Sequence, residues 1–207
     1  MCGIAGLWRD LRADQCPDLE TSVIAMAAAL SHRGPDAAGV WSDAAAGVAL
    51  GHQRLAIVDL SHAGHQPMAS ASGRYVIAFN GEIYNHVRLR EQLQRSGAIV
   101  QPWRGHSDTE TLLAAIEAWG LEGALQRCAG MFALALWDRQ ERRLQLARDR
   151  FGEKPLYWGW LDQAGQRVLV FASELAAIRA CPGAVTPSVN PDALAAFFVP
   201  AACQPPR

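Results

Sequence analysis

The sequence predicts a layered α/β domain in which much of the strand pairing is antiparallel. Short apolar and β-branched runs predict strands, and fewer segments have the pattern of helices. Strands and helices do not alternate strictly, which argues against a doubly wound parallel sheet. Many strand runs are apolar at consecutive positions, as expected for strands that are covered on both faces. A flavodoxin-like arrangement is the second choice.

Each expected element has a local signal. The predicted strands are residues 4–8, 48–51, 55–58, 75–79, 131–137, 144–147 and 168–171, several with turn residues at their ends. The predicted helices are residues 18–30, 87–96 and 109–119. Ser107 or Asp108 is expected to cap the last helix, because both side chains accept hydrogen bonds from free backbone N–H groups. The polar residues 139–142 predict a hairpin turn.

Composition excludes several classes of protein. The chain has 207 residues, and its 50% hydrophobic content supports a well-buried core. With 19 Lys+Arg against 20 Asp+Glu, nothing indicates nucleic acid or an anionic membrane as a partner, so a small-molecule substrate is expected. No secretory signal is visible, and the longest apolar run, residues 23–30, is too short to span a bilayer.

The cysteines indicate a reducing compartment. They are Cys2, Cys16, Cys128, Cys181 and Cys203, an odd number without C-x-x-C spacing. This pattern argues against a disulfide framework and against a cysteine-built zinc site. A soluble, cytoplasmic protein is therefore expected.

The chain is expected to divide near residue 185. Residues 1–185 read as one domain, whereas residues 186–207 are rich in proline around one short helical run, residues 192–198. That run ends in Phe197, Phe198 and Val199, apolar residues that need a partner surface. The segment 186–207 therefore resembles a connector to a further domain, and truncation, a frameshift or a split gene would all explain it.

Cys2 is the candidate nucleophile. A residue as small as cysteine after Met1 generally permits removal of the initiator methionine, which would give Cys2 a free α-amine. An α-amine has a reference pKa of about 7.7–8.0 against about 10.4 for lysine, so a useful fraction is unprotonated near neutral pH. Nucleophile and base would then belong to one residue, and no histidine is required.

Five motifs follow one another along the chain: Met1-Cys2-Gly3-Ile4-Ala5-Gly6, His32-Arg33-Gly34-Pro35-Asp36, Gly51-His52-Gln53-Arg54-Leu55-Ala56-Ile57-Val58-Asp59, Asn80-Gly81-Glu82-Ile83-Tyr84-Asn85 and Ser107-Asp108-Thr109-Glu110. In this order they resemble the glutaminase domain of asparagine synthetases, a class II glutamine amidotransferase with an N-terminal nucleophile. Further likeness extends to about Ile178. The resemblance implies a four-layer α/β/β/α sandwich of two mainly antiparallel sheets, and hydrolysis of glutamine to glutamate and ammonia.

The resemblance also implies roles for individual residues. The Asn80 side chain and the Gly81 N–H would form the oxyanion hole. Arg54 would grip the α-carboxylate of glutamine, and Asp108 its α-ammonium. Glu82 is expected to help bind the α-ammonium of glutamine. The backbone around Leu55 and Ile57 is expected to line the pocket, and these residues complete the predicted glutamine-binding site.

Other polar groups are predicted to have no catalytic or metal-binding role. His62 and His65 lack a third ligand in register, so no metal is assigned to this domain. Arg148-Asp149-Arg150 is expected to be structural, and His32 and Arg33 are expected near the nucleophile without touching substrate.

The expected partner is a synthetase domain or subunit. In the family, ammonia is used there for the ATP-dependent amidation of aspartate to asparagine, so ATP and Mg²⁺ belong to that absent half and no cofactor is expected here. The alternatives are a glutaminase domain of another class II amidotransferase, such as glucosamine-phosphate synthase or a phosphoribosylamine-forming enzyme, and a non-catalytic fragment. Homo-oligomerisation is left open.

Overall fold

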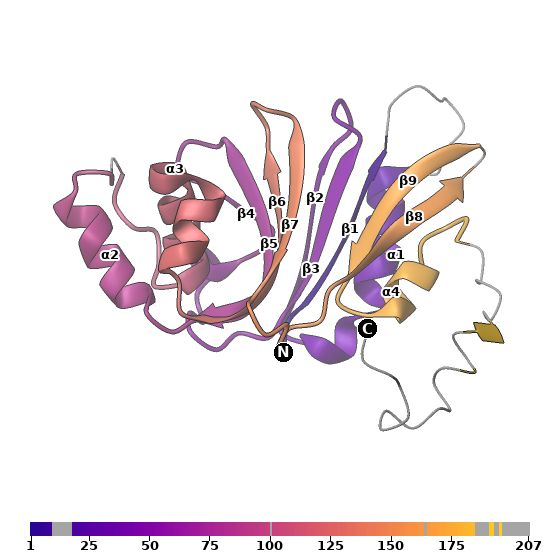
Figure 1. The fold of residues 1–207 in the computed structure, drawn as a ribbon, viewed down its shortest axis with the longest axis horizontal. Helices are drawn as coiled ribbons and strands as arrows, with labels where there is room; N and C mark the ends of the chain where they lie inside the picture. The colour runs from indigo at the N-terminus through magenta and orange to yellow at the C-terminus, as the bar shows by residue number, and fades with distance from the viewer. Residues whose placement is uncertain (10–17, 100, 164, 185–190, 193–194, 196–207) are drawn as a thin grey trace.

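The computed structural model describes residues 1–9, 18–99, 101–163, 165–184, 191–192 and 195. Two antiparallel sheets face each other, and helices cover the outer side of each sheet (Figure 1). The predicted four-layer α/β/β/α fold is therefore confirmed.

The first sheet holds the N-terminus at its centre. Its strand order is β2-β3-β1-β9-β8. The strands are β1 (Gly3–Arg9), β2 (Ala37–Asp43), β3 (Val48–Arg54), β8 (Tyr157–Gln163) and β9 (Gln166–Ala172). Helices α1 (Leu19–Ala28) and α4 (Leu175–Arg179) pack on its outer face. Strand β1 pairs with β3 from Gly3 onward and with β9 from Ala5 onward, so Cys2 directly precedes a strand that is paired on both sides.

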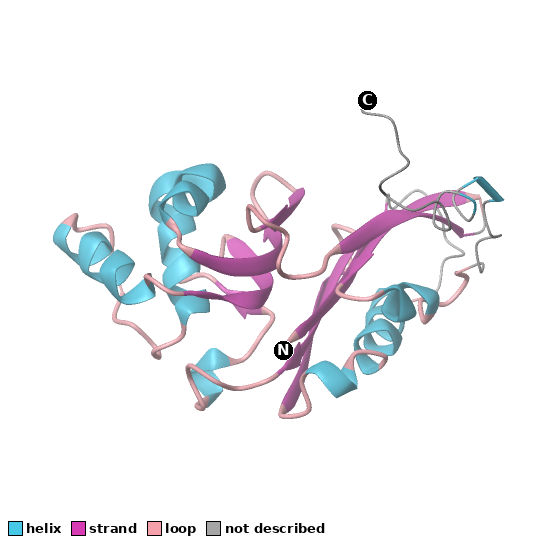
Figure 2. Ribbon diagram, turned by 60° about the horizontal axis from the view of Figure 1, so that its bottom comes forward, coloured by secondary structure: helices cyan, strands magenta, loops and turns pink. Residues whose placement is uncertain are grey.

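The second sheet has the order β4-β5-β6-β7. Its strands are β4 (Met68–Ala69), β5 (Tyr75–Ile83), β6 (Gly130–Asp138) and β7 (Arg143–Arg148). Its outer face is covered by α3 (Asp108–Arg127), against which α2 (His86–Arg95) packs. Two 3-10 helices, η1 (Ser31–Arg33) and η2 (His62–Gly64), lie in the connections. Figure 2 shows the helices on the outside of both sheets.

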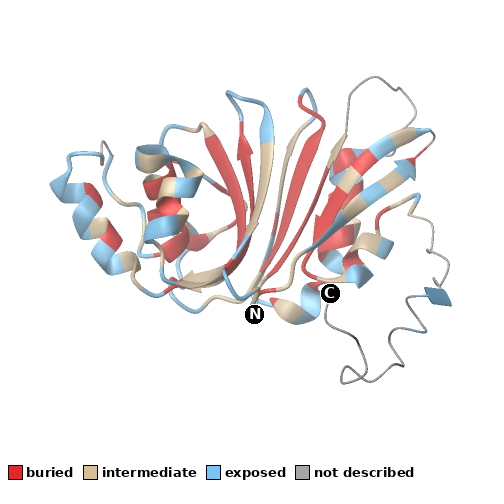
Figure 3. Cartoon of the chain, viewed as in Figure 1, coloured by how far each residue is buried: buried red, intermediate tan, exposed pale blue. Residues whose placement is uncertain are grey.

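The core has three parts, one between the sheets and one under each helical layer. On β5, Val76 and Ala78 point toward the first sheet, whereas Ile77 and Phe79 point toward α3. Both faces of the strand are therefore buried, as the red strands of Figure 3 show. This double burial explains why the strand sequences are apolar at consecutive positions.

Some predicted elements differ from the structure. The strand predicted over residues 55–58 is wrong, because β3 ends at Arg54 and the next residues form a loop. Ile57 in that loop exposes 70% of its surface, so the apolar run covers no sheet. Strands β2, β4 and β8 were not predicted. Strand β2 begins Ala-Ala-Gly, without the β-branched signal, and Gly159 interrupts β8.

The helix boundaries follow local chemistry. Ser107 caps α3 by accepting the Glu110 N–H at 3.2 Å, as the sequence indicated. Helix α3 runs beyond the predicted end, with a break at Gly120, whose φ of 72° favours glycine. The predicted helix 192–198 and its Phe197, Phe198 and Val199 lie largely outside the described residues, as does most of the segment 186–207. Among the described helices, none is long and apolar enough to cross a membrane.

Candidate active site

A cavity of about 120 Å³ lies beside the start of β1, near the ends of β3 and β5. All the residues that the sequence predicted for the site line this cavity: Cys2, Arg54, Leu55, Ile57, Asn80, Gly81, Glu82 and Asp108. They come from segments up to about a hundred positions apart, and the fold brings them together. Their proximity is observed, whereas their individual chemical roles stay predictions.

The Cys2 thiol is held by the backbone of Leu55. The Leu55 N–H donates to Cys2 Sγ at 3.4 Å, and the thiol donates to the Leu55 carbonyl at 3.6 Å. Burial raises the pKa of the Cys2 thiol, and the Leu55 contact and the positive charges of the N-terminus and Arg54 only partly oppose this effect. The thiol is therefore not ionised in advance, and an attack by this sulfur requires a base.

The backbone of Cys2 is fixed by a buried guanidinium. Arg33 Nε donates to the Cys2 carbonyl at 3.0 Å, and its Nη1 donates to Glu174 Oε1 at 2.8 Å. This hydrogen bond is the main reason why the pKa of Glu174 lies below its usual value. His32 also reaches Glu174, at 3.1 Å. Arg33 therefore positions the backbone of Cys2, and His32 contacts Glu174, the partner of Arg33.

The edge of β5 that faces away from β6 presents backbone N–H groups to the cavity. Antiparallel pairing uses every second residue on one side, so residues 79, 81 and 83 direct their N–H groups to this edge. The Phe79 N–H donates to Gln66 Oε1 at 2.7 Å, and the Ile83 N–H donates to Asp108 Oδ2 at 2.8 Å. Between them, no side chain or loop among the described residues accepts from the Gly81 N–H, which lines the cavity.

Asn80 supplies a second unused donor. The residue is only 1% exposed, and its Nδ2 group has no hydrogen-bond partner among the residues that the structure describes. A buried polar group without a partner costs about 1–3 kcal/mol. Such a group in a cavity wall is explained when a ligand atom is its acceptor.

Glycine is required at position 81 by the neighbouring strand. A Cβ there would lie 2.3 Å from the Met131 carbonyl oxygen and 2.6 Å from Phe132 Cβ. No side chain fits in that space, so the backbone of β5 approaches β6 closely here. Because glycine has no side chain that could cover it, the Gly81 N–H remains accessible from the cavity.

Two carboxylates, those of Asp108 and Glu82, line the same cavity as Asn80 and Gly81. Asp108, 5% exposed, begins α3, and its oxygens accept the Ile83 and Thr109 N–H groups at 2.8 and 2.9 Å. Burial raises the pKa of the Asp108 carboxyl, against the lowering effect of these hydrogen bonds. Glu82, partly exposed, lines the same cavity. The pair gives the cavity an anionic end that suits an ammonium group.

Arg54 holds the loop that closes one side of the cavity. Its Nη1 donates to the Ser61 carbonyl at 3.1 Å, and its Nη2 donates to the Asp59 carbonyl. The guanidinium is therefore already engaged by neutral acceptors of the loop while it lines the cavity.

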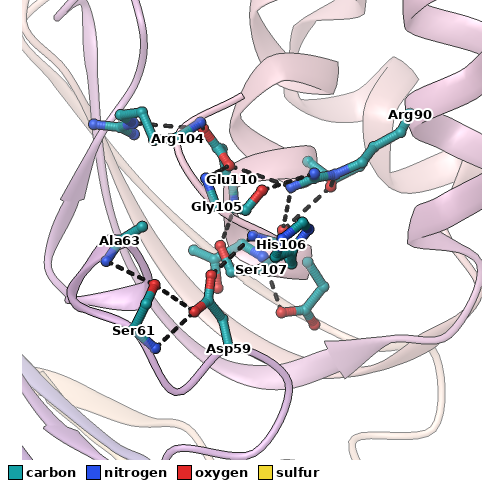
Figure 4. A network of polar contacts seen from close by, with 12 residues as sticks. Asp59, Ser61, Ala63, Arg90, Arg104, Gly105, His106, Ser107 and Glu110 are labelled. Carbon is teal, nitrogen blue, oxygen red and sulfur yellow. Dashed lines mark hydrogen bonds and ion pairs between the residues drawn. The ribbon is translucent and has the colours of Figure 1, made fainter. Parts of the chain in front are cut away.

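Asp59 ties this loop to the start of α3 (Figure 4). Its Oδ1 accepts the Ser61 hydroxyl at 2.6 Å and the Ser61 N–H at 2.8 Å, and its Oδ2 accepts the His106 N–H at 2.8 Å. The pKa of Asp59 is lowered to about 2, chiefly by the Ser61 hydroxyl. Asp59 was not predicted as a site residue, although it ends the motif of residues 51–59.

Glu110 and Arg90 extend the network behind the cavity. Glu110 accepts the Arg104 and Gly105 N–H groups at 2.8 and 3.1 Å, and Arg90 Nη2 reaches the same carboxylate at 3.2 Å. Sequence reasoning missed Arg90 as well as Gln66, whose amide joins Phe79 to Thr109. No motif or pattern in the sequence identified Arg90 as part of this network. For Gln66 the only sequence feature was its position directly before Pro67.

No metal site is found in the part of the chain that the structure describes. His62 and His65 lie with ring centroids 5.3 Å apart, but no group of three or more candidate ligands surrounds them or any other described point. His52 is buried outside the cavity, and its Nε2 bonds to the Phe79 carbonyl at 3.0 Å. Burial lowers the pKa of His52 to about 4, so this histidine is neutral at physiological pH.

Comparisons with known proteins agree with this geometry. Residues 1–207 match the family described as glutamine amidotransferase domain. The chain is 38% identical over 174 residues to asparagine synthetase (glutamine-hydrolyzing) 1 of Bacillus subtilis, a match that covers 84% of this chain and 26% of that protein. It is 39% identical over 178 residues to asparagine synthetase B (glutamine-hydrolyzing) of Escherichia coli, with 86% and 30% covered. The chain thus spans between a quarter and a third of these relatives' length.

A solved structure has the same fold. Glutamine phosphoribosylpyrophosphate amidotransferase from B. subtilis superposes with a TM-score of 0.67 at 22% sequence identity. The match covers 87% of this chain and 43% of that chain. At this identity the likeness concerns the fold alone.

Proposed function

The chain belongs to the glutamine amidotransferase domain family, and on that premise we propose that it hydrolyses free glutamine to glutamate and ammonia. The observation that carries the proposal is the buried Asn80 Nδ2 group. It lacks a partner among the described residues and lines the cavity that contains the Cys2 thiol. An unused donor beside a nucleophile is what amide hydrolysis needs, because negative charge develops on the carbonyl oxygen in the transition state.

The first half of the reaction forms a thioester. After removal of Met1, the Cys2 α-amine accepts the thiol proton, and the thiolate attacks the carboxamide carbon of glutamine. Asn80 Nδ2 and the Gly81 N–H donate to the oxygen of the tetrahedral intermediate. The protonated amine then gives its proton to the departing nitrogen, which leaves as ammonia.

The second half uses the same groups with water. The α-amine takes a proton from a water molecule, and the resulting hydroxide attacks the thioester carbon. The same two donors stabilise the second tetrahedral intermediate, the carbon–sulfur bond breaks, and glutamate leaves with the thiol restored. The raised pKa of the Cys2 thiol supports this scheme, since the sulfur needs a base at its side.

The ends of the cavity select a free amino acid. Asp108, with Glu82, would bind the α-ammonium, and Arg54 would bind the α-carboxylate, which is a stronger acceptor than the two carbonyls it contacts. Leu55 and Ile57 would line the path of the side chain. Glutamine within a peptide lacks both charges and would be rejected.

The ammonia is proposed to serve the ATP-dependent amidation of aspartate to asparagine in a synthetase domain or subunit, in the cytoplasm. Two relatives named as glutamine-hydrolysing asparagine synthetases support this acceptor. ATP and Mg²⁺ would bind in that other half, and this domain would need no cofactor. An acid other than aspartate is the alternative acceptor.

A coupled assay on the purified chain tests the proposal. Glutamine should yield ammonia and glutamate in equal amounts, whereas added ATP and aspartate should yield neither AMP nor asparagine. A protease-cleavable extension before Cys2 should silence the enzyme until it is removed, because an amide nitrogen is not a base. Absence of ammonia release from the processed chain, with glutamine binding seen by calorimetry, would establish the non-catalytic alternative instead.

A further inference from the structure

Lys154 stands apart from every other basic residue of the chain. It is the only lysine in the sequence, since all the other basic side chains among the 19 Lys+Arg are arginines. It is also 6% exposed and lines the cavity that contains Cys2. Lysine is among the residue types least often buried unless it is paired. Its place in this cavity therefore asks for an explanation.

The surroundings of Lys154 fix its backbone but give its ammonium no counter-ion. Its N–H donates to Asp149 Oδ2 at 3.2 Å, and its carbonyl accepts from Arg148 Nε at 2.7 Å. The ammonium donates to Met1 Sδ at 3.2 Å, and no carboxylate of the described residues forms an ion pair with it. A thioether is a weak acceptor, so this contact does not balance the loss of hydration.

We propose that Lys154 is a positioning residue that keeps the α-amine of processed Cys2 in its unprotonated, basic form. The inference rests on the proposed function, in which Met1 is removed and that amine is the base. Removal of Met1 takes away the contact that Lys154 has at the N-terminus, and leaves the ammonium beside the new terminal residue in one cavity. A positive charge nearby disfavours protonation of an amine.

The other charged side chains around Cys2 differ in whether a partner of opposite charge offsets them. From η1, Arg33 is neutralised by its pair with Glu174, which caps α4. At the end of β3, Arg54 donates to neutral loop carbonyls, so its positive charge also acts on Cys2, whereas Asp59 of that loop is bonded to Ser61 and His106.

The remaining carboxylates lie on β5 and α3. Asp108 is bonded to backbone N–H groups, and Glu82 forms no ion pair with Lys154. Both carboxylates favour the protonated amine and suit a substrate ammonium. Lys154 and Arg54 are therefore the side-chain cations on the described surface of the cavity that no carboxylate pairs with, and Lys154 is the one that contacts Met1.

The absence of other lysines makes the test direct, because the processed chain has only two amines, the α-amine and Lys154 Nζ. The thiols are first blocked as methyl disulfides, because an acetyl group on Cys2 Sγ would transfer to the α-amine of the same residue. Trace acetylation with acetic anhydride across a pH series then gives the titration of each amine by mass spectrometry. We expect the α-amine of the wild type to titrate below its reference value of about 7.7–8.0.

Lys154→Met removes the charge and keeps the shape, and should raise the α-amine midpoint by about one pH unit, a tenfold change in proton affinity. Lys154→Arg keeps the charge and should leave the midpoint near that of the wild type. The acidic limb of kcat/KM should move with the amine in both variants. The melting temperature of Lys154→Met should not fall, because a thioether loses less hydration on burial than an ammonium.

The outcomes separate the two claims. Equal α-amine midpoints in the wild type and Lys154→Met would overturn the role of Lys154, whether or not ammonia is released. Wild-type ammonia release with unequal midpoints supports both claims. A shifted midpoint without ammonia release by the wild type would overturn the proposed function, and with it any role of Lys154 in catalysis.

Discussion

Two walls of the active-site cavity are built from different kinds of structure. One wall is β5, where Asn80 is buried in a strand of nine residues whose register with β6 is set by backbone hydrogen bonds. The other is the loop after β3, in which Ile57 and Leu60 expose 70% and 79% of their surface. This loop owes its shape to polar contacts of Arg54 and Asp59 rather than to a core.

The difference separates chemistry from binding. A strand buried on both faces holds its donors rigidly, and rigid donors stabilise a transition state without reorganisation. A loop held by a few polar contacts can move to admit a ligand and then close on it. Changes in the strand wall should therefore lower kcat, whereas changes in the loop wall should raise KM.

The largest effect should come from Cys2, the proposed nucleophile in this cavity. We expect Cys2→Ala to abolish ammonia release and to leave the melting temperature nearly unchanged, because this side chain contributes little to the core. Cys2→Ser should also be severely impaired, since a hydroxyl is a weaker nucleophile at neutral pH. Ammonia release by Cys2→Ala at the wild-type rate would reject the nucleophile assignment.

The strand wall is tested next by Asn80→Ala. Loss of one oxyanion donor should lower kcat by roughly two to three orders of magnitude, with a small effect on KM. Asn85→Ala is the matched control, because the Asn85 side chain bonds to the Arg127 carbonyl and the Ala129 N–H outside the cavity.

In steady-state kinetics and thermal unfolding, the control should lose stability and keep kcat. If Asn80→Ala changed only KM, the assignment of catalysis to the strand wall and of binding to the loop wall would be wrong.

The loop wall is tested by Arg54→Lys. An ammonium cannot replace the forked contacts of the guanidinium, so we expect KM for glutamine to rise by about tenfold while kcat changes less. Arg95→Lys, at an exposed surface pair with Glu91, should change neither constant. A fall in kcat alone in Arg54→Lys would assign this residue to the chemistry.

The smallest effect should come from Asp59→Asn, which weakens the hydrogen bonds that hold the loop. The pKa of Asp59 is about 2 in the folded chain against 3.8 as its ordinary value. Its stabilising contribution is therefore complete above about pH 5 and is lost as the pH falls toward 2. We expect Asp59→Asn to lower the unfolding free energy at pH 7 by on the order of 2 kcal/mol, and to differ little from the wild type near pH 2. Urea unfolding at both pH values measures this.

The residues of the site were predicted from sequence motifs. The strand that forms one wall, β5, was predicted from its run of consecutive apolar residues. Asn80 and Gly81 follow a run that is apolar at consecutive positions, which correctly indicated a buried strand. The family resemblance is likewise confirmed. The roles within the site, the division near residue 185 and the absence of cofactors stay predictions.

The loop wall was harder to predict for a physical reason. Residues 55–58 have the composition of a strand, but their apolar side chains face solvent and the cavity, and only the end of β3 at Arg54 reveals this. Gln66 and Arg90 act through partners far away in sequence, so no local pattern could identify them.

The central position of β1 has a consequence for how the chain folds. Strand β1, which follows Cys2, is made before β9, yet it pairs with that strand, and the Ile4 N–H donates to the Ser173 hydroxyl across 169 positions of sequence. Contacts so distant form late, because closing a long loop costs chain entropy before it is rewarded. On a ribosome, the sheet around Cys2 therefore stays incomplete until almost the whole domain has emerged.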